Sequence, residues 1–348
     1  MPRMLSFTSV LNAEVVDEQS RPLEADEVRI STLYSGISAG TELTAYRGTN
    51  AYMNKKWDEE LRLFVDGSTS FEYPVNGWGY EEVGEVSEVG ADVTSVAVGD
   101  VIWGTWGHRT ETIQKADRAA QRILKPGTDA RVGIFSQIGA IALNVVLDAD
   151  IHVGETVVVF GLGVPGQLVA QIARLNGARV IGVDGVASRR ELAMKLGADL
   201  VLDANEGSVA EKVRALTDGR GADVCLEVSG NYRALNEAIR TVAYNSRVCV
   251  AGFMQGEGIG LRLGDEFHHN RVQLVCAQIS GVNPSIDHRW NEYRLQRTFI
   301  DLAVSGKVNV TDLISHEFPL EEGGAAFELV DTATTDVLQV VLNAKAGA

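Results

Sequence analysis

The sequence predicts an α/β plus β protein: a β domain followed by an α/β domain with a doubly wound parallel sheet. Residues 1–148 contain short β-branched runs separated by glycines, which is typical of antiparallel or barrel-like β structure. Residues 149–285 alternate apolar strand-like runs with amphipathic stretches whose apolar residues recur every three or four positions, which indicates right-handed βαβ units. Residues 286–348 contain two more helical stretches and a closing strand, which we expect to return to the first domain.

Composition and charge argue against two classes of binding partner, nucleic acids and membranes. The chain has 348 residues, 45% of them hydrophobic and 22% charged, as in ordinary folded proteins. Its formal net charge of −16 repels phosphate backbones and anionic lipids, and no apolar run approaches the roughly 20 residues needed to cross a bilayer. We therefore expect a small-molecule substrate, no nucleic acid and no membrane. Cys225, Cys249 and Cys276 lie in separate apolar runs, which predicts buried thiols in a reducing, cytoplasmic compartment.

A glycine-rich loop is the strongest local signal. Residues 155–184 run from a strand through Gly161, Gly163 and Gly166 into a helix and then into a second strand. In this context the first glycine permits a tight turn, the second lets the backbone approach a pyrophosphate, and the third allows helix and strand to pack closely. The helix N-terminus adds free N–H groups and a positive dipole end. The predicted phosphate-binding residues are Gly161, Gly163, Val164, Pro165 and Gly166.

An acidic residue after this loop predicts which dinucleotide binds. Asp184 ends the second strand of the unit, where a carboxylate accepts hydrogen bonds from the adenosine ribose hydroxyls and repels a 2′-phosphate. Asp184 therefore favours NAD over NADP. Arg189 and Arg190 follow closely and weaken this preference, because arginines near this position can hold a 2′-phosphate.

Longer segments resemble the medium-chain dehydrogenase/reductase superfamily, in particular its zinc-type alcohol and polyol dehydrogenases. The resemblance covers nearly the whole chain and rests on residues 35–48, 77–104, 142–166 and 189–199. The motifs GISAGTE and GYE followed by VGEV are similar to the bacteriochlorophyllide-dehydrogenase-like branch. The resemblance implies a GroES-like β-barrel catalytic domain over 1–148, a Rossmann domain over 149–285, and a C-terminal return to the catalytic domain over 286–348.

The same resemblance implies further positions and an assembly. It places the active site in the cleft between the two domains and puts Arg189 at the position that contacts the adenosine ribose. It also implies cofactor contacts from Ser229, Gly252 and Phe253, which follow later strands of the α/β domain. The run RVQLVCAQISG resembles the edge strand through which relatives pair their sheets, so we expect a homodimer.

The chain departs from this family at its catalytic zinc. The family pattern needs a cysteine, a histidine within Gly-His-Glu, and a cysteine or acid before the linker. These positions hold Ser38 or Ala39, then Tyr80, and Gln137, none of which is a usual zinc ligand. The four-cysteine structural zinc lobe is also missing. We therefore predict a zinc-independent enzyme; the alternative is an unusual site that recruits Glu81 and a histidine such as His108.

Without a metal, other groups must stabilise the developing alkoxide, and hydrogen-bond donors in a dry site can do this. The candidates at the vacated positions are the Tyr80 hydroxyl, the Gln137 amide and the Ser38 hydroxyl. Thr41 falls where the family places a hydroxyl that relays the alcohol proton, and Glu81 remains as a carboxyl beside them. With an ordinary pKa of about 10, Tyr80 suits proton donation in reduction; otherwise it fills the space left by the zinc.

These observations predict an NAD-dependent oxidoreductase that interconverts a secondary alcohol and a ketone. The basic and aromatic residues within 45–77 indicate a polar or anionic substrate. One alternative is a zinc-free, NADPH-dependent C=C reductase of the quinone or enoyl type, in which hydride addition needs only an oxyanion hole. The other is a non-catalytic dinucleotide-binding protein that kept the fold and lost the chemistry.

Overall fold

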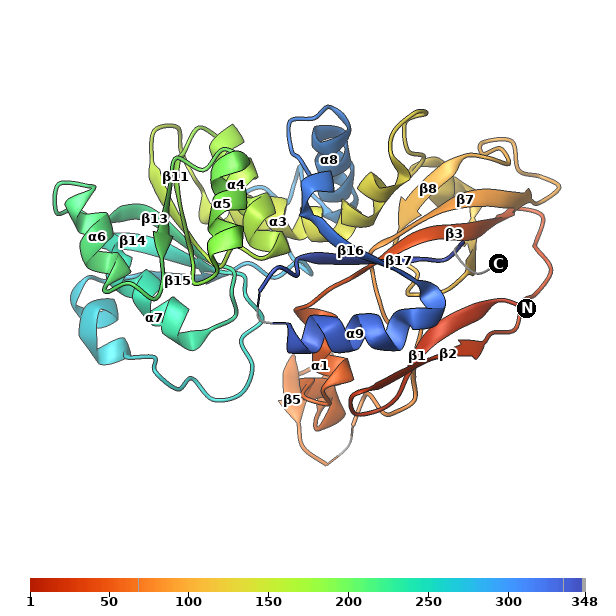
Figure 1. Cartoon of the computed structure of the whole chain (residues 1–348), viewed down its shortest axis with the longest axis horizontal. Helices are drawn as coiled ribbons and strands as arrows, with labels where there is room; N and C mark the ends of the chain where they lie inside the picture. Colours follow the sequence, from red (N-terminus) through yellow and green to blue (C-terminus); the bar gives the residue numbers. More distant parts are fainter. Residues whose placement is uncertain (68, 334, 346–348) are drawn as a thin grey trace. The chain divides into compact units, whose positions relative to one another are not determined.

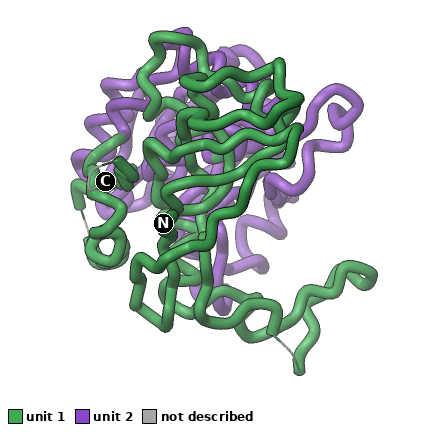
Figure 2. The backbone as a smooth tube through the Cα atoms, turned by 90° about the vertical axis from the view of Figure 1, so that its right-hand side faces the viewer, with its two compact units in different colours: residues 1–137, 314–348 green, residues 138–313 purple. Residues whose placement is uncertain are grey.

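The chain folds into two compact units, coloured separately in Figure 2. The computed structural model describes residues 1–67, 69–333 and 335–345. Unit 1 comprises residues 1–137 and 314–348, and unit 2 comprises residues 138–313. The units therefore divide the chain at other points than the expected domains: residues 138–148 and 286–313 both lie in unit 2.

Unit 1 is built on β-sheets. In its described part the larger sheet has the order β16-β17-β3-β7-β8, with β9 also paired to β3, and a smaller sheet has the order β2-β1-β6. The strands are Arg3–Ser9 (β1), Asn12–Asp17 (β2), Glu27–Ile37 (β3), Lys56–Asp58 (β4), Leu63–Val65 (β5), Val75–Asn76 (β6), Glu82–Val89 (β7), Val101–Gly104 (β8), Glu111–Lys115 (β9), Ile314–Pro319 (β16) and Gln339–Asn343 (β17). The helices are Thr41–Tyr46 (α1), Ala116–Ala120 (α2) and Gly323–Thr332 (α9).

Apolar side chains from distant segments fill the core of unit 1. Phe7 of β1 and Phe327 of α9 meet edge to face at 4.9 Å, and Tyr46 of α1 packs against both. Such aromatic pairs stabilise a fold beyond the area they bury. The core thus ties the C-terminal helix α9 to the N-terminal sheet. Within 45–77 the chain forms part of α1, a short hairpin of β4 and β5, and β6.

Strand pairing in unit 1 brings three distant segments together. The end of β3 pairs with the start of β7, with Ser35 opposite Glu82, and the Gly36 N–H donates to the Glu81 carbonyl at 2.7 Å. On the other edge of β3, Val340 of β17 lies opposite Ile37. Residues that follow β3, precede β7 and begin β17 therefore meet at one end of the sheet.

Unit 2 contains, among its described residues, a parallel sheet of six strands in the order β12-β11-β10-β13-β14-β15. This confirms the doubly wound parallel sheet expected from the sequence. Figure 1 labels β11, β13, β14 and β15 of this sheet. The strands are Thr156–Phe160 (β10), Arg179–Asp184 (β11), Leu200–Asp203 (β12), Ala222–Glu227 (β13), Val242–Val250 (β14) and Gln273–Cys276 (β15). The helices are Ser136–Ala149 (α3, which starts in unit 1), Val164–Leu175 (α4), Ala187–Lys195 (α5), Val209–Ala215 (α6), Tyr232–Thr241 (α7) and Glu292–Val304 (α8).

Helices cover both faces of this sheet. Apolar residues of α6 and α7, such as Val213 and Ile239, form one buried cluster with strand residues such as Val158 and Val248. On the other face Cys249 of β14 contacts the carbonyl of Val145 in α3. Because the strands are buried on both faces, they are continuously apolar rather than alternating.

Two expectations need correction. Cys225 and Cys249 are buried as predicted, but Cys276 is exposed because it ends β15, the last strand of the sheet order. Residues Ala130–Ala149 also form a helical stretch long and apolar enough to cross a membrane, which the search for apolar runs missed. Because 89% of the most apolar 18-residue window in that stretch is buried inside the protein, the stretch also fits a core helix.

Candidate functional site

Three hydroxyl groups meet at the end of β3; we call Ser38, Thr41 and Tyr80 the hydroxyl cluster. The Ser38 and Tyr80 hydroxyl oxygens lie 2.5 Å apart, and the Tyr80 hydroxyl lies 3.4 Å from Thr41 Oγ1. Ser38 directly follows β3 and Tyr80 lies just before β7, so the pairing of these strands brings them together. Thr41 is the first residue of α1, whose Glu42 N–H donates to the Ser38 carbonyl at 3.1 Å.

The protonation state of Tyr80 follows from its surroundings. Burial raises the pKa of Tyr80 well above its ordinary value, and Glu81 and Glu42 add to this rise when they are ionised, although Ser38 and Thr41 oppose it. Tyr80 therefore stays protonated at neutral pH. A protonated phenol donates a hydrogen bond and does not act as a base, which fits the predicted role of proton donor and disfavours that of general base.

Beside the hydroxyl cluster lies a group of ionisable side chains that we call the buried acid cluster: Glu42, Glu81, Glu82 and His108. All four are 0% exposed, and charged residues are rarely buried so completely without a partner. Burial raises the pKa of Glu42 and of Glu81 well above their ordinary range, and it lowers the pKa of His108 to about 4. Burial therefore favours the neutral forms of Glu42, Glu81 and His108.

Hydrogen bonds connect most of the buried acid cluster into a chain. His108 Nε2 lies 2.8 Å from Glu42 Oε2, and His108 Nδ1 lies 2.6 Å from the Ser35 hydroxyl. The Ser35 hydroxyl lies 3.2 Å from Glu82 Oε1, and Glu82 Oε2 accepts the Trp106 N–H at 2.6 Å. Burial raises the pKa of Glu82, while His108 and the backbone N–H groups of Trp106 and Gly107 oppose that shift.

Glu81 lies apart from this chain. Neither of its carboxyl oxygens has a hydrogen bond of ordinary geometry within the described part of the protein. A side chain on Gly36 would place its Cβ 2.5 Å from Glu81 Oε2 and 2.8 Å from the Gln339 amide nitrogen, so glycine makes room for both. Gln339 is the neighbouring group that opposes the rise in the pKa of Glu81. This amide also donates to the carbonyls of Ile37 and Val340, at 3.2 Å each.

Replacing Glu81 by Gln is expected to change how stability depends on pH. Because the folded-state pKa of Glu81 is raised above the unfolded value near 4.3, its contribution to stability is present below that value and is lost as pH rises towards the folded pKa. The amide introduced in Glu81→Gln does not titrate, so this variant should become more stable relative to the wild type by up to about 1.4 kcal/mol per pH unit in this window. Denaturant unfolding at pH 5 to 8 measures the difference.

A matched control for this prediction is Glu60→Gln, because Glu60 is exposed. This control should give a stability difference that is constant over the same pH range. If the Glu81→Gln and wild-type curves stay parallel, Glu81 titrates alike in both states and is not held neutral by burial.

The predicted phosphate-binding loop lies in unit 2 between β10 and α4. Gly161 has φ +92°, a conformation that favours glycine, and a side chain on Gly166 would place its Cβ 1.8 Å from the Gly161 carbonyl oxygen. A Cβ on Gly163 would meet no protein atom within 4 Å. Gly163 is the N-cap of α4 and supplies no side-chain hydrogen bond, so the N–H groups of Val164 and Gly166 are left without a side-chain cap; Pro165 between them has no N–H. These features fit a bound pyrophosphate.

The end of β11 fits the adenosine half of a dinucleotide. Asp184 accepts the N–H groups of Leu162 and Val186, each at 2.8 Å, so its carboxylate is held beside the glycine loop. A carboxylate accepts about four hydrogen bonds, which leaves capacity for ribose hydroxyls. Arg190 donates to the Asp184 carbonyl at 2.9 Å and forms an ion pair with Asp203 at 2.8 Å.

Two further strand ends lie beside the loop. A side chain on Gly161 would contact Ser229, which follows β13, and one on Gly252 would contact the Gly230 backbone and Glu227. The Ser229 N–H and hydroxyl both donate to Glu227 Oε1, and Phe253 is exposed. The expected cofactor residues of β13 and β14 thus follow the carboxyl ends of their strands, where open parallel sheets bind ligands. Their contacts with a dinucleotide remain predictions.

The structure also shows what the sequence left unassigned. Gln137 is buried as the second residue of α3, and its proposed part in catalysis remains a prediction. Glu42, Glu82 and Ser35 were not predicted as site residues. Their only sequence signal is position: Glu42 follows Thr41, Glu82 follows Glu81, and Ser35 lies opposite Glu82 once β3 and β7 pair.

The residues present do not fit a catalytic zinc. In the described ranges, histidines, cysteines and acids form no group of three or more arranged to hold a metal ion. Ser38 and Tyr80, at two family ligand positions, share a hydrogen bond with each other. Both ring nitrogens of His108, which could have joined Glu81 in an unusual site, already contact Ser35 and Glu42.

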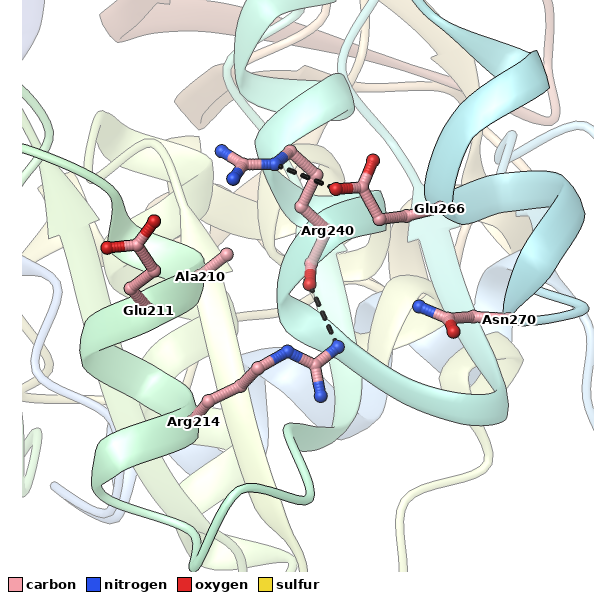
Figure 3. A pocket seen from close by; sticks show the side chains of 6 residues that line it. All are labelled: Ala210, Glu211, Arg214, Arg240, Glu266 and Asn270. Atoms are coloured by element: carbon pink, nitrogen blue, oxygen red, sulfur yellow. Dashed lines mark hydrogen bonds and ion pairs between the residues drawn. The ribbon is translucent and has the colours of Figure 1, made fainter.

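A polar hollow of about 260 Å³ in unit 2 is shown in Figure 3. Its lining residues are Ala210, Glu211, Arg214, Arg240, Glu266 and Asn270. The Arg214 guanidinium donates to the backbone carbonyls of Gly219, Arg220, Arg240 and Val242. Arg240 pairs with Glu237 and Glu266. These contacts join the ends of α6 and α7, so we assign the hollow no part in the chemistry.

Comparison with known proteins adds independent observations. A sequence model of the zinc-binding dehydrogenase family matches residues 163–292. The chain is 32% identical over 320 residues to D-guloside 3-dehydrogenase of Escherichia coli (strain K12), and this match covers 90% of the chain and 91% of the relative.

Solved structures share the fold at lower identity. A zinc-binding dehydrogenase from Sinorhizobium meliloti 1021 bound to NADP matches with a TM-score of 0.78 and 21% identity over 99% of both chains. An alcohol dehydrogenase from Escherichia coli CFT073 complexed with NADH matches with a TM-score of 0.74 and 17% identity over 98% of this chain and 99% of the other. One of these holds NADP and the other NADH, so the fold does not decide between the two dinucleotides.

Proposed function

The chain belongs to the medium-chain dehydrogenase/reductase superfamily, and from this premise we propose that it interconverts a secondary alcohol and a ketone with NAD and without zinc. It is an NAD(P)-dependent dehydrogenase with a GroES-like domain and a Rossmann domain. A bound nicotinamide dinucleotide supplies the hydride acceptor for oxidation and the hydride donor for reduction. We propose a polyhydroxylated substrate, because the Escherichia coli relative is named for a guloside.

The hydroxyl cluster is the observation that carries this proposal. Reduction of a ketone builds negative charge on its oxygen, and a donor aimed at that oxygen stabilises the transition state. Tyr80 stays protonated and is fixed by Ser38 at 2.5 Å, so it donates a hydrogen bond without needing a metal. Thr41 lies next to Tyr80 and passes protons between the substrate and the protein.

Asp184 supports NAD as the dinucleotide. Its carboxylate is held at the edge of the glycine loop, where it would repel a 2′-phosphate. Arg190 is paired with Asp203 and therefore competes poorly for such a phosphate. Replacing Asp184 by Asn should reduce the ratio of kcat/KM for NAD over NADP at least about tenfold, since the repulsion is removed. Steady-state kinetics with both dinucleotides measures this ratio.

The control for this variant is Asp218→Asn. Asp218 is exposed in unit 2 with φ +52°, a conformation that asparagine tolerates. Its replacement should leave the ratio unchanged. If Asp184→Asn keeps the wild-type ratio of kcat/KM for NAD over NADP, residues other than Asp184 determine the preference between the two dinucleotides.

Turnover of a substrate panel tests the function itself. Purified protein is incubated with polyols, sugars and glycosides plus NAD⁺ or NADP⁺, and reduced nicotinamide is followed by absorbance. The same preparation is analysed for bound metal and assayed after chelation. The proposal expects NAD-dependent oxidation that survives chelation. Zinc bound in stoichiometric amount and needed for turnover would overturn the metal-free mechanism.

Two outcomes would favour the alternatives. Strong preference for NADPH together with turnover of an enone would indicate a C=C reductase. Tight dinucleotide binding without turnover of any alcohol or carbonyl would indicate a non-catalytic binding protein.

A further inference from the structure

Ketone reduction needs a proton as well as a hydride, and the hydroxyl cluster has no spare proton to give. Tyr80, Ser38 and Thr41 each hold one proton at neutral pH, and a hydroxyl that gives its proton to the substrate must receive another. A group that can give up and regain a proton must therefore stand behind the cluster. Glu42 and Glu81, which directly follow Thr41 and Tyr80 in the chain, belong to the buried acid cluster, and the proposed function assigns this cluster no role.

We propose that Glu42, His108, Ser35 and Glu82 form a buried proton wire that delivers the proton for reduction to the hydroxyl cluster and takes it back in oxidation. This inference rests on the proposed function, because it concerns the same reaction and the same site. The four residues are linked by contacts of 2.8, 2.6 and 3.2 Å in that order, and each is at most 1% exposed.

The hydrogen bonds of this chain can all point in one direction or all in the other, depending on which group of each pair donates; we call these the loaded and the discharged direction. In the loaded direction, protonated Glu82 donates to Ser35, Ser35 donates to His108 Nδ1, and His108 Nε2–H donates to Glu42 Oε2. The remaining proton of Glu42 then sits on Oε1. In the discharged direction, Glu42 Oε2–H donates to Nε2, Nδ1–H donates to Ser35, and Ser35 donates to the Glu82 carboxylate. Every hydrogen bond is kept in both directions, and the imidazole stays neutral throughout.

Passing from one direction to the other transfers one proton. During reduction the carbonyl carbon takes a hydride with its electron pair from the reduced nicotinamide, and the oxygen takes a proton from the hydroxyl cluster. In the proposed route the cluster recovers that proton from Glu42 Oε1 through one bridging water, and one hydrogen shifts along each link of the wire. The net change is the loss of one proton from Glu82, and oxidation runs the same steps in reverse. The proton balance closes when Glu82 takes up one proton from solvent between turnovers.

The two ends of the wire are suited to these tasks. Glu42 Oε1 is buried and has no hydrogen-bond partner among the described residues, so a bridging water or a substrate hydroxyl would be its partner in the proposed route. At the other end, the Glu82 carboxylate is stabilised by the backbone N–H groups of Trp106 and Gly107. When Glu82 loses its proton, these two N–H groups are already in place to stabilise the negative charge.

The groups around the imidazole agree with a neutral carrier. His108 contacts Glu42 and Ser35 through its nitrogens, and the Phe327 ring meets it edge to face at 5.7 Å. When Glu82 is ionised it favours the imidazolium, but burial outweighs this effect and lowers the pKa of His108 to about 4. A carrier that never becomes a cation needs no buried counter-charge.

Breaking the wire in the middle tests it. Ser35→Ala removes only the hydroxyl that joins His108 to Glu82, and Glu82→Gln removes the exchangeable proton at the end. Each variant should lower kcat for ketone reduction about 100-fold at pH 7, with little change in KM for the dinucleotide. The control is Ser6→Ala, since Ser6 is an equally buried serine of unit 1 whose hydroxyl has no hydrogen-bond partner in the described residues.

Two readouts separate a proton wire from a structural role. The wild-type rate of reduction should fall at alkaline pH as the wire loses its proton, and this limb should vanish in Ser35→Ala and Glu82→Gln. The double variant should be no slower than either single variant, because both break one pathway. Additive losses with an unchanged pH profile would overturn the inference.

A measurement without substrate guards against variants that misfold. Nitrogen-15 NMR of the His108 ring in the dinucleotide-free protein should show a neutral imidazole at pH 7, and an imidazolium there would overturn the wire. Failure of the proposed function is distinguishable, because the wild-type protein would then turn over no member of the substrate panel. Wild-type turnover combined with wild-type kinetics in Ser35→Ala would overturn the wire alone.

Discussion

Replacing Tyr80 by Phe is expected to lower kcat for both directions of the reaction about 100-fold, the usual effect of removing one donor from a developing oxyanion. Tyr80 donates from a position fixed by Ser38 at 2.5 Å, and its pKa is raised, so it is protonated whenever substrate binds. The residues expected to bind the dinucleotide lie in unit 2, so KM for NAD should change little. Steady-state kinetics with the alcohol found in the panel measures both constants.

Tyr73→Phe is the matched control. The Tyr73 hydroxyl donates to the Ala45 carbonyl at 2.5 Å, so this variant also deletes a bonded phenol from unit 1. It should lower stability and leave kcat within a few-fold of the wild type. If Tyr80→Phe also keeps nearly full activity, Tyr80 only fills the space that a metal occupies in other members of the family.

Local patterns explain why much of unit 2 could be predicted. The six strands and the glycine loop depend on short apolar runs and on one turn that needs Gly161, Gly163 and Gly166. Each signal lies within a few residues of the chain, where sequence and structure are directly linked. The position of Asp184 beside the loop follows from the same βαβ unit.

The site in unit 1 depends on contacts that no local pattern contains. Ser38 and Tyr80 meet because β3 pairs with β7. Resemblance to the family pointed to these positions, but the residues alone did not. Glu42 and Glu82 look like ordinary surface acids in the sequence, since glutamate is usually solvated. Only the packing of β3, β7, β17 and α1 shows that both are fully buried.

Which strand lies at the edge of the sheet could not be predicted from the sequence either. Cys276 lies in an apolar run like those of Cys225 and Cys249, yet it is exposed. The reason is topological: β15 is the last strand in the sheet order, and an apolar run does not reveal whether its strand is central or at an edge.

Two glycine variants are expected to separate folding from dinucleotide binding. In Gly166→Ala the new methyl group would lie 1.8 Å from the Gly161 carbonyl oxygen, so backbone must move. Overpacking of this kind costs about 1–3 kcal/mol, and the distorted loop should also bind NAD more weakly. In Gly163→Ala the methyl group meets no protein atom within 4 Å, so the free energy of unfolding should stay near the wild-type value.

Gly163→Ala should nevertheless weaken NAD binding at least about tenfold, or 1.4 kcal/mol, because the methyl group occupies the space where a pyrophosphate approaches the backbone. Denaturant unfolding and calorimetric titration with NAD⁺ measure the two effects separately. Gly281→Ala, also free of contacts within 4 Å, should change neither. Wild-type NAD affinity in Gly163→Ala would mean that the open space over this glycine is not where the pyrophosphate lies, and it would remove the physical basis for placing the dinucleotide on the β10–α4 loop.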